Sequence, residues 1–196
     1  MKESGISAVL LAAGLSLRMG EDKLLMQYRG VTMLQRAVDL LAVLHVYEKI
    51  LVTTKSRLDF ITLPPDIVAI INPQPESGQS GSVRLGVTAA SGGWYFFMVA
   101  DQPGLTSSDL RQLIDNTANN EGKIIYPVIN GNPSAPVLFP SRFRNELLDL
   151  SGDAGGRVLR ARHPEACAGF EPKYPERFID IDCAGDFERL KILSNE

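Results

Sequence analysis

Two glycines and two cations follow the first apolar run of the chain, in the segment from Gly14 to Lys23 that also contains Arg18 and Gly20. Glycine allows backbone N–H groups to approach a phosphate closely, while arginine and lysine supply positive charge and directed hydrogen-bond donors. The spacing fits neither the Walker A loop nor the G-x-G-x-x-G dinucleotide motif. A phosphate-binding loop and a plain solvated turn are both open, and the convergence of cations and glycines after a buried strand favours the phosphate-binding loop.

Carboxylates follow or end other apolar segments. Asp101 comes directly after the most apolar run, residues 94–100, and Asp180 and Asp182 lie in the segment 179–182. A carboxylate at the end of a buried strand is costly unless it is paired or bound to a metal. Since Mg²⁺ takes one or two carboxylates together with substrate phosphates, we predict Asp101 as a ligand, with Asp180 or Asp182 completing the site. A turn cap at Asp101 and an edge strand with an acidic outer face at 179–182 are the alternatives.

A loop rich in glycine, proline and serine spans residues 72–86 and leads into a predicted helix. Asn72 opens this loop, and Gly78 and Ser82 lie around the start of the helix, where free backbone N–H groups favour anions. The loop is either a platform for a nucleobase or a substrate phosphate, or an ordinary surface loop with a helix cap.

A second glycine-rich segment, residues 150–159, contains Asp153, Gly155 and Arg157. The start of a helix does not require so many glycines. This segment is either a receiving site for a second ligand or a tight left-handed turn with Asp153 as the N-cap of the next helix.

The elements that must position these residues alternate between strands and helices. Apolar runs predict strands at 6–12, 49–54, 66–71, 94–100, 123–129, 135–139 and 177–182. Spacing and caps predict helices at 31–44 (with Thr32 and Gln35 as a capping box), 80–90, from a cap at Ser107 or Ser108 to about 118, 142–150, 154–162 and 185–193. This order indicates an α/β fold with a mostly parallel sheet, an added antiparallel strand and helices on both faces. Because ligands bind beyond the carboxyl ends of such strands, functional residues are expected at 12–23, 72–82, 101–103 and 180–186.

Composition limits the class of protein. The chain has 196 residues, which suits a single domain, and its net charge of −3 comes without a basic stripe. Because nucleic-acid binding needs such a stripe, no nucleic-acid partner is expected. The first apolar run, about ten residues long, is too short to span a membrane, and two cysteines are too few for a disulfide framework or a zinc site. We therefore expect one cytoplasmic domain, residues 1–196, with no membrane partner.

The residues from Leu11 to Leu25, LAAGLSLRMGEDKLL, resemble the LAAGxSxRMGxxKLL signature of the MobA-like nucleotidyltransferases, in particular their molybdenum cofactor cytidylyltransferase branch. The likeness continues in the family order through NPQPESGQSGSVRLGV, VADQPGLT, PVLF, LLDLSGDAGGRVL and IDIDCAGDFERL, so it covers nearly the whole chain. It implies a three-layer, Rossmann-like nucleotidyltransferase fold. It also implies Mg²⁺-dependent transfer of CMP from CTP to molybdopterin or molybdenum cofactor, with release of pyrophosphate.

The residue pattern and the resemblance together give roles to individual residues. Nucleotide contacts are expected for Leu11, Ala12, Ala13, Gly14, Arg18, Lys23, Asn72, Gly78 and Ser82. Acceptor contacts are expected for Gln102, Ser134, Ala135, Asp153, Gly155 and Arg157. Catalytic roles are expected for Arg18, Lys23 and Asp101, and metal binding for Asp101 with Asp180 or Asp182. The resemblance implies cytosine as the base, because the cytidylyl branch has LAAG, with Ala13, where the guanylyl branch has LAGG.

The chain departs from the family pattern at two places. The Gly-His-Pro that precedes the family's VLF strand reads Ser134-Ala135-Pro136, so a histidine on the pterin side is missing, and the closing TPED reads CAGD at 183–186. The alternatives therefore include guanylyl transfer, another phosphorylated acceptor such as a sugar or polyol phosphate, and a non-catalytic accessory protein that handles the cofactor. The expected partners are small-molecule substrates and a molybdoenzyme that receives the cofactor, and the expected oligomeric state is a monomer or a weak dimer.

Overall fold

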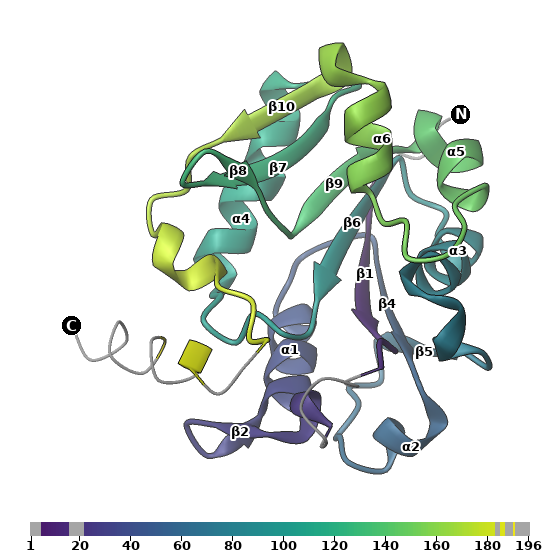
Figure 1. The fold of residues 1–196 in the computed structure, drawn as a ribbon, viewed down its shortest axis with the longest axis vertical. Helices are drawn as coiled ribbons and strands as arrows, with labels where there is room; N and C mark the ends of the chain where they lie inside the picture. The colour runs from purple at the N-terminus through teal and green to yellow at the C-terminus, as the bar shows by residue number, and fades with distance from the viewer. Residues whose placement is uncertain (1–4, 16–21, 183–184, 187–189, 191–196) are drawn as a thin grey trace.

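The structure is a computed structural model, and it describes residues 5–15, 22–182, 185–186 and 190 (Figure 1). Arg18 and Gly20 of the predicted phosphate-binding loop, and most of the predicted closing helix at 185–193, lie outside these residues. The other predicted elements can be compared directly.

A central sheet of eight strands organises the molecule. The strands are β1 (Ile6–Ala12), β4 (Glu48–Thr53), β5 (Ile67–Ile71), β6 (Trp94–Val99), β7 (Ile124–Ile129), β8 (Asn132–Pro133), β9 (Val137–Pro140) and β10 (Cys167–Phe170). Their order is β10-β7-β9-β6-β1-β4-β5, and β8 pairs with β7. The β1 strand runs parallel to β4 and β6, whereas β9 runs antiparallel to β6 and β7. The predicted α/β fold, mostly parallel with added antiparallel pairing, is confirmed.

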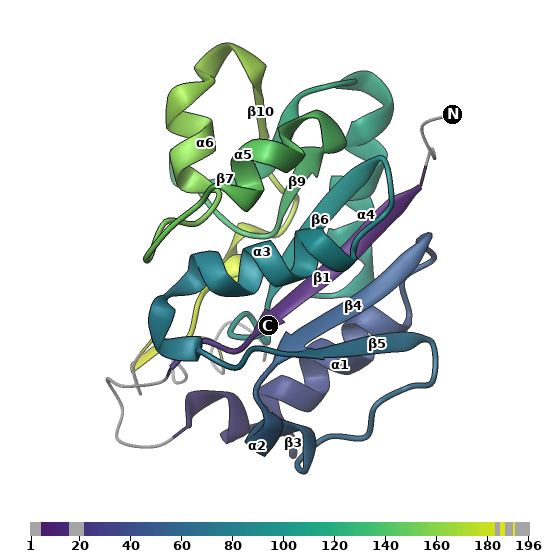
Figure 2. The same ribbon diagram turned by 90° about the vertical axis from the view of Figure 1, so that its right-hand side faces the viewer.

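Helices cover both faces of this sheet and make three layers (Figures 1 and 2). On one face lie α1 (Met33–Ala42) and α4 (Ser107–Asp115), and on the other α3 (Gln79–Ala89), α5 (Arg144–Leu148) and α6 (Arg157–Arg162). A short helix, α2 (Lys55–Leu58), follows β4. No helix in the described part of the chain has the length and apolar character needed to span a membrane.

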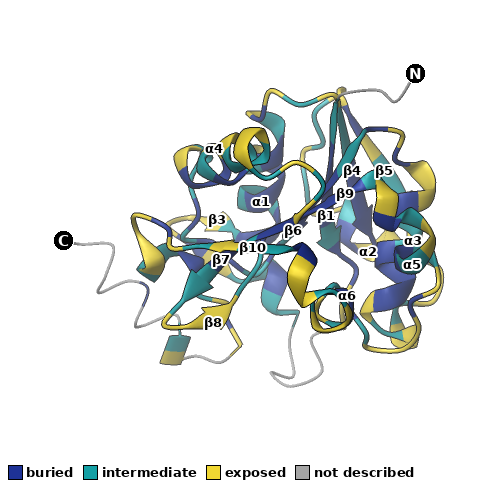
Figure 3. Cartoon of the chain, turned by 90° about the horizontal axis from the view of Figure 1, so that it is seen from above, coloured by how far each residue is buried: buried dark blue, intermediate teal, exposed yellow. Residues whose placement is uncertain are grey.

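Side chains of β1 alternate between two apolar clusters, one under each helical layer. Leu10 packs in the cluster that contains Leu34 of α1 and Leu110 of α4. Its neighbour Val9 packs with Val83 of α3 and the residues beneath α5. The strand is therefore buried on both faces, as its continuous apolar run predicts. Figure 3 shows the same pattern, with buried positions along the sheet and exposed ones on the outer sides of the helices.

The starts of two predicted helices depend on contacts that local spacing does not show. The helix predicted at 31–44 starts at Met33, because β3 (Val31–Thr32) pairs with β2 (Gln27–Tyr28) in a small two-stranded sheet. Thr32 still caps it, since its Oγ1 accepts a hydrogen bond from the Gln35 backbone N–H at 3.1 Å. The cap of α4 is Thr106 rather than a serine, because its hydroxyl and backbone N–H both donate to the Asp109 carboxylate.

The prediction of a strand at 177–182 is wrong. The edge of the sheet beside β7 is formed instead by β10, which was not predicted. Residues Pro175–Phe178 form a short 3₁₀ helix, which the proline at its first position favours. Residues 179–182 have no regular secondary structure, and the Ile181 N–H donates to the carbonyl of Asp101 at 2.9 Å rather than to a neighbouring strand. The residues CAGF of β10 include a glycine and no β-branched side chain, so the short segment does not predict a strand.

Candidate active site

Lys23 connects three segments of the chain at the carboxyl ends of β1 and β6. Its Nζ donates to Asp101 Oδ2 at 2.9 Å, to Asp182 Oδ1 at 3.0 Å and to the carbonyl of Ile181 at 3.0 Å. Burial alone would lower the pKa of Lys23, but the charges and hydrogen bonds of the two carboxylates outweigh it and raise the pKa. The structure therefore brings together a cation and two acids that the sequence predicts for one site, and it keeps the lysine charged.

The backbone of Ile181 fixes the acidic C-terminal segment against the end of β6. Its N–H donates to the carbonyl of Asp101, and its own carbonyl accepts from Lys23. The backbone N–H of Asp182 donates to Asp186 Oδ2 at 3.0 Å, which holds the next turn of the chain. Because Ile181 is fully buried, the residues on either side of it, Asp180 and Asp182, are held beside Asp101 without a strand.

Negative charge is under-compensated in this cluster. Desolvation, together with the charges of Asp101 and Asp182, raises the pKa of Asp180 to about 6. Asp101 Oδ2 accepts from Lys23, while its Oδ1 is buried and has no hydrogen-bond partner among the described residues. A carboxylate oxygen with this environment fits a hard divalent cation.

The acidic residues around Lys23 could supply part of the ligands of a metal ion. The described part of the chain contains no group of three His, Cys, Asp or Glu side chains arranged to hold a metal ion. Mg²⁺ keeps several waters and is usually bound by one or two carboxylates plus substrate phosphates. Asp101 and one of its acidic neighbours can supply that number.

A hollow of about 540 Å³ opens beside Lys23. We call it the larger hollow, because a second hollow that adjoins it is smaller. Residues predicted to bind the nucleotide or metal line it: Leu11, Gly14, Lys23, Gly78, Ser82, Asp101 and Asp182. Glu76 and Gln79, which were not predicted, line it as well. The hollow lies outside the carboxyl ends of β1 and β6. In the strand order the chain continues from β1 toward β4 in one direction and from β6 toward β7 in the other, and a ligand is expected at such a point in this type of sheet.

Three predicted nucleotide-binding residues lie behind this surface. The side chains of Ala12 and Ala13 are each about 1% exposed, and the carbonyl of Ala12 already accepts from Thr53 and Arg57. Asn72 is buried, and its Nδ2 donates to Ser82 Oγ at 3.1 Å while its Oδ1 accepts from the backbone of Gln74. Ala12 and Asn72 thus support the lining of the hollow in this structure.

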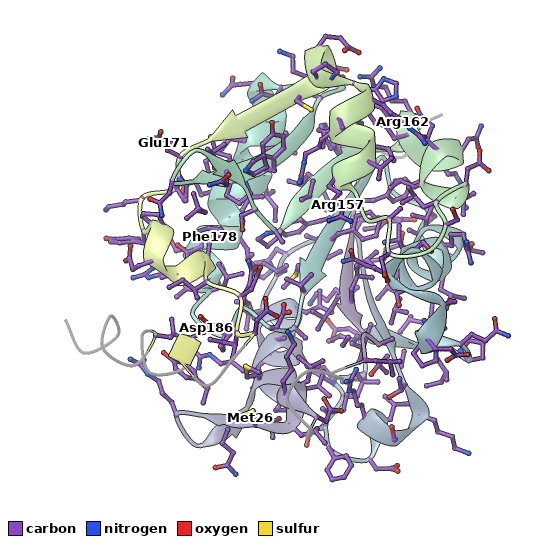
Figure 4. The ribbon with its side chains drawn as sticks, viewed as in Figure 1. Met26, Arg157, Arg162, Glu171, Phe178 and Asp186 are labelled. Carbon is purple, nitrogen blue, oxygen red and sulfur yellow. The ribbon has the colours of Figure 1, made fainter. Side chains whose placement is uncertain are left out.

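A smaller hollow of about 270 Å³ adjoins the larger one. Five of the six residues predicted for the acceptor line it: Ser134, Ala135, Asp153, Gly155 and Arg157. The sixth, Gln102, is buried behind it, where its Nε2 donates to the carbonyls of Ala135 and Phe178 at 3.2 and 3.3 Å. Asp180 and Arg160 complete its polar lining, with Phe97 and Phe139 among its apolar residues. Figure 4 labels Arg157 at the first turn of α6 and Phe178 on the C-terminal segment.

The two hollows share part of their walls, formed by Leu11, Gln79, Val99 and Asp153. This wall depends on close contact between the start of α3 and the loop before α6. Gly78 has φ +91°, and a Cβ there would lie 2.5 Å from the carbonyl oxygen of Gly152. The N–H of Ser80 donates to that same carbonyl at 3.2 Å. The two glycine-rich segments of the sequence are therefore one structural unit between the hollows.

Sequence reasoning missed Gln79, Arg160 and Arg57. Gln79 lies inside the predicted loop 72–86, so the pattern indicated the loop but did not single out this side chain. Arg160 lies one turn after Arg157 on α6, and helical spacing could have paired them. Arg57 follows the end of β4, and the rule that functional residues follow strands, applied there, could have drawn attention to it.

A family model describes the same region of the chain. The model of the MobA-like NTP transferase domain matches residues 8–167. The chain belongs to the MobA-like NTP transferase family. Membership of this MobA-like family confirms the resemblance noted in the sequence and identifies the protein as a nucleotidyltransferase.

The names of individual relatives of this chain specify different nucleobases. The molybdenum cofactor cytidylyltransferase of Escherichia coli (strain K12) is 30% identical over 194 residues, which cover 96% of each chain. A probable molybdenum cofactor guanylyltransferase of Bacillus cereus (strain B4264) is 27% identical over 205 residues, covering 98% of this chain and all of that one. The crystal structure of Rv0371c from Mycobacterium tuberculosis H37Rv has a TM-score of 0.79 at 24% identity, covering 97% of this chain and 98% of that one, and supports the fold.

Proposed function

We propose that this protein transfers CMP from CTP to the phosphate of molybdopterin or molybdenum cofactor, with Mg²⁺ bound and pyrophosphate released. The observation that carries the proposal is the pair of adjoining hollows, with Lys23 and the acidic residues around it. The larger hollow suits a nucleoside triphosphate, and the smaller one suits the acceptor.

The reaction forms and breaks one bond each at the α-phosphorus. An oxygen of the acceptor phosphate attacks this phosphorus, and the bond to the oxygen that bridges to the β-phosphate breaks, so that oxygen leaves with pyrophosphate. No covalent bond to the protein is needed, because positioning and electrostatic stabilisation supply most of the rate in this kind of chemistry.

Different residues of the protein would bind the triphosphate and the metal ion. Lys23 would bind the triphosphate with the same Nζ that now binds Asp101 and Asp182. Asp101 and Asp180 are the carboxylates proposed to hold the metal, because Asp101 Oδ1 has no hydrogen-bond partner among the described residues and Asp180 has the raised pKa. Mg²⁺ when bound would neutralise charge on the phosphates. Arg18, by resemblance, would add a second cation to the triphosphate.

The smaller hollow has the chemistry of a phosphorylated ring compound. Arg157 and Arg160 offer guanidinium groups of the kind that bind phosphate, while Phe97 and Phe139 offer an apolar surface for a planar ring. Ser134 and Ala135 stand where the family has its glycine and histidine, so recognition on this side would depend on the arginines. A sugar or polyol phosphate would use the arginines but gain less from the apolar surface.

One assay tests the proposal. Pyrophosphate release is measured with each of the four common nucleoside triphosphates in turn, with and without molybdopterin, in the presence of Mg²⁺. Release with CTP alone, and only when molybdopterin is present, is the expected result. Release with GTP instead would make the protein a guanylyltransferase, and release only with a sugar or polyol phosphate would replace the acceptor. Nucleotide binding without any release would support the accessory role and overturn the proposal.

A further inference from the structure

Arg57 is a buried arginine whose side-chain hydrogen bonds to the described residues go to the two ends of the predicted phosphate-binding loop. Its side chain is about 5% exposed. On the near side of the loop, Nη1 donates to the carbonyl of Ala12 at 2.7 Å and Nη2 to that of Gly14 at 2.9 Å. On the far side, Nε and Nη2 donate to the two carboxylate oxygens of Asp22 at 2.6 and 2.8 Å. One guanidinium therefore joins the two ends of the loop to each other.

Asp22 passes this constraint on to Lys23. Its Oδ1 also accepts from the backbone N–H of Leu24 at 3.1 Å, so the carboxylate caps the 3₁₀ turn Lys23–Leu25 that carries the lysine. The turn is thus fixed at its start by an ion pair to Arg57 and at its lysine by Asp101 and Asp182. A bidentate guanidinium–carboxylate pair fixes direction as well as distance, which a single ammonium contact does not.

Arg57 itself stands back from the reaction. Neither hollow includes it among the described residues that line it. Any effect on chemistry must therefore act through the residues it holds, and it would be a positioning residue rather than a catalytic one.

We propose that Arg57 is the positioning residue of the triphosphate loop, setting the distance between Gly14 and Asp22 and through it the orientation of Lys23. The kinetic consequence rests on the proposed function, since it requires that Lys23 bind the triphosphate. The structural consequence does not, because it concerns only the hydrogen bonds at the two ends of the loop.

The test compares Arg57→Met and Arg57→Lys with a matched control, Arg144→Met. Arg144 is a partly buried arginine that lies near the start of β6 rather than its end. Like Arg57 it donates to backbone carbonyls, those of Val87 and Ala90 at 2.6 and 3.0 Å, and it donates to the Tyr95 hydroxyl as well. Arg57→Met is expected to raise the KM for the nucleoside triphosphate about tenfold or more, and Arg57→Lys to restore little of it because lysine cannot bind bidentately. Arg144→Met is expected to lower the melting temperature without changing that KM.

Amide hydrogen exchange provides a readout that does not depend on activity. Exchange in a peptide spanning residues 22–28 is expected to speed up in Arg57→Met and in Asp22→Asn, and to stay at the wild-type rate in Arg144→Met. If the wild-type protein turns over no nucleotide, the proposed function fails while faster exchange still supports the constraint. If Arg57→Met does not fold, Asp22→Asn, which removes the same ion pair from the exposed side, supplies both measurements. Wild-type KM together with wild-type exchange in the folded Arg57 and Asp22 variants would overturn the proposal.

Discussion

Replacing Asp101 by asparagine separates the catalytic use of this residue from its contribution to stability. The substitution keeps the shape and removes one charge, so Lys23 loses its ion pair at 2.9 Å. At an effective dielectric constant of about 20, two opposite charges at that distance attract by about 6 kcal/mol before desolvation is subtracted. Desolvation of the two charges offsets most of this attraction, and removing the charge also relieves the repulsion of Asp180. We expect the free energy of unfolding to change by no more than about 1 kcal/mol, or roughly 2–4 °C in melting temperature.

The catalytic loss should be much larger. If Asp101 holds the metal that stabilises charge on the phosphates, its removal should lower kcat about 10³-fold, equivalent to about 4 kcal/mol of transition-state stabilisation. Pyrophosphate release at saturating CTP and acceptor measures kcat, and calorimetry of the same sample measures the melting temperature. Asp182→Asn is the matched control, since it also removes one ion pair of Lys23 but at a side chain that is 64% exposed. A loss of about tenfold is expected there.

Two results would refute this reasoning. An Asp101→Asn variant that retains more than a tenth of wild-type kcat cannot have lost a metal ligand. A fall in melting temperature of more than about 10 °C would mean that the residue holds the fold together, so that the kinetic loss could not be assigned to chemistry.

Three further outcomes follow from the geometry of the site. Lys23→Ala should raise the KM for CTP by about tenfold or more, because it removes a cation from the triphosphate, and an unchanged nucleotide affinity in a calorimetric titration would count against this role. Asp180→Asn should raise the melting temperature of the metal-free protein at pH 8 but not at pH 4. The folded-state pKa of Asp180, about 6, lies above the ordinary value of 3.8, so ionisation of the native carboxyl lowers the stability as the pH rises through that range. The amide of asparagine stays neutral throughout. An equal gain in melting temperature at both pH values would contradict the raised pKa of Asp180. Gly78→Ala should destabilise the protein by about 1–3 kcal/mol, because φ is +91° and a Cβ would lie 2.5 Å from the Gly152 carbonyl oxygen. Gly14→Ala, where no atom of the described residues lies within 4 Å of the added atom, should leave the melting temperature unchanged, and equal melting temperatures for both variants would disprove the crowding at Gly78.

Local pattern was sufficient for the sheet interior and for the residues at strand ends. The run at 6–12 predicts β1 with the bounds that the structure shows, because a strand buried on both faces has no polar position to blur its ends. Lys23 and Asp101 were found from residue type and from their place after apolar runs, although 78 residues separate them. The parallel sheet accounts for this, since it brings successive strand ends to one edge.

Long-range contacts account for what local pattern could not give. Asp180 and Asp182 were predicted at the site but on a strand, and their placement instead depends on backbone hydrogen bonds from Ile181 to Asp101 and Lys23. Arg57 lies in the polar stretch TTKSRLD, which has the appearance of an exposed turn. Its burial follows only from Asp22, 35 residues away, and from two carbonyls of the first strand and loop.

The contact between Lys23 and Asp182 joins residues 159 positions apart, so the site closes only when the two ends of the chain meet. A chain shortened before Asp180 would still contain every strand of the eight-stranded sheet, yet it would lack Asp180, Asp182 and the backbone carbonyl that Lys23 binds. Such a fragment could keep much of its secondary structure and still be inert. For this protein, a circular dichroism spectrum that reports normal secondary structure would be no guide to enzymatic competence, because most of the sheet can form before the last ligands have been synthesised.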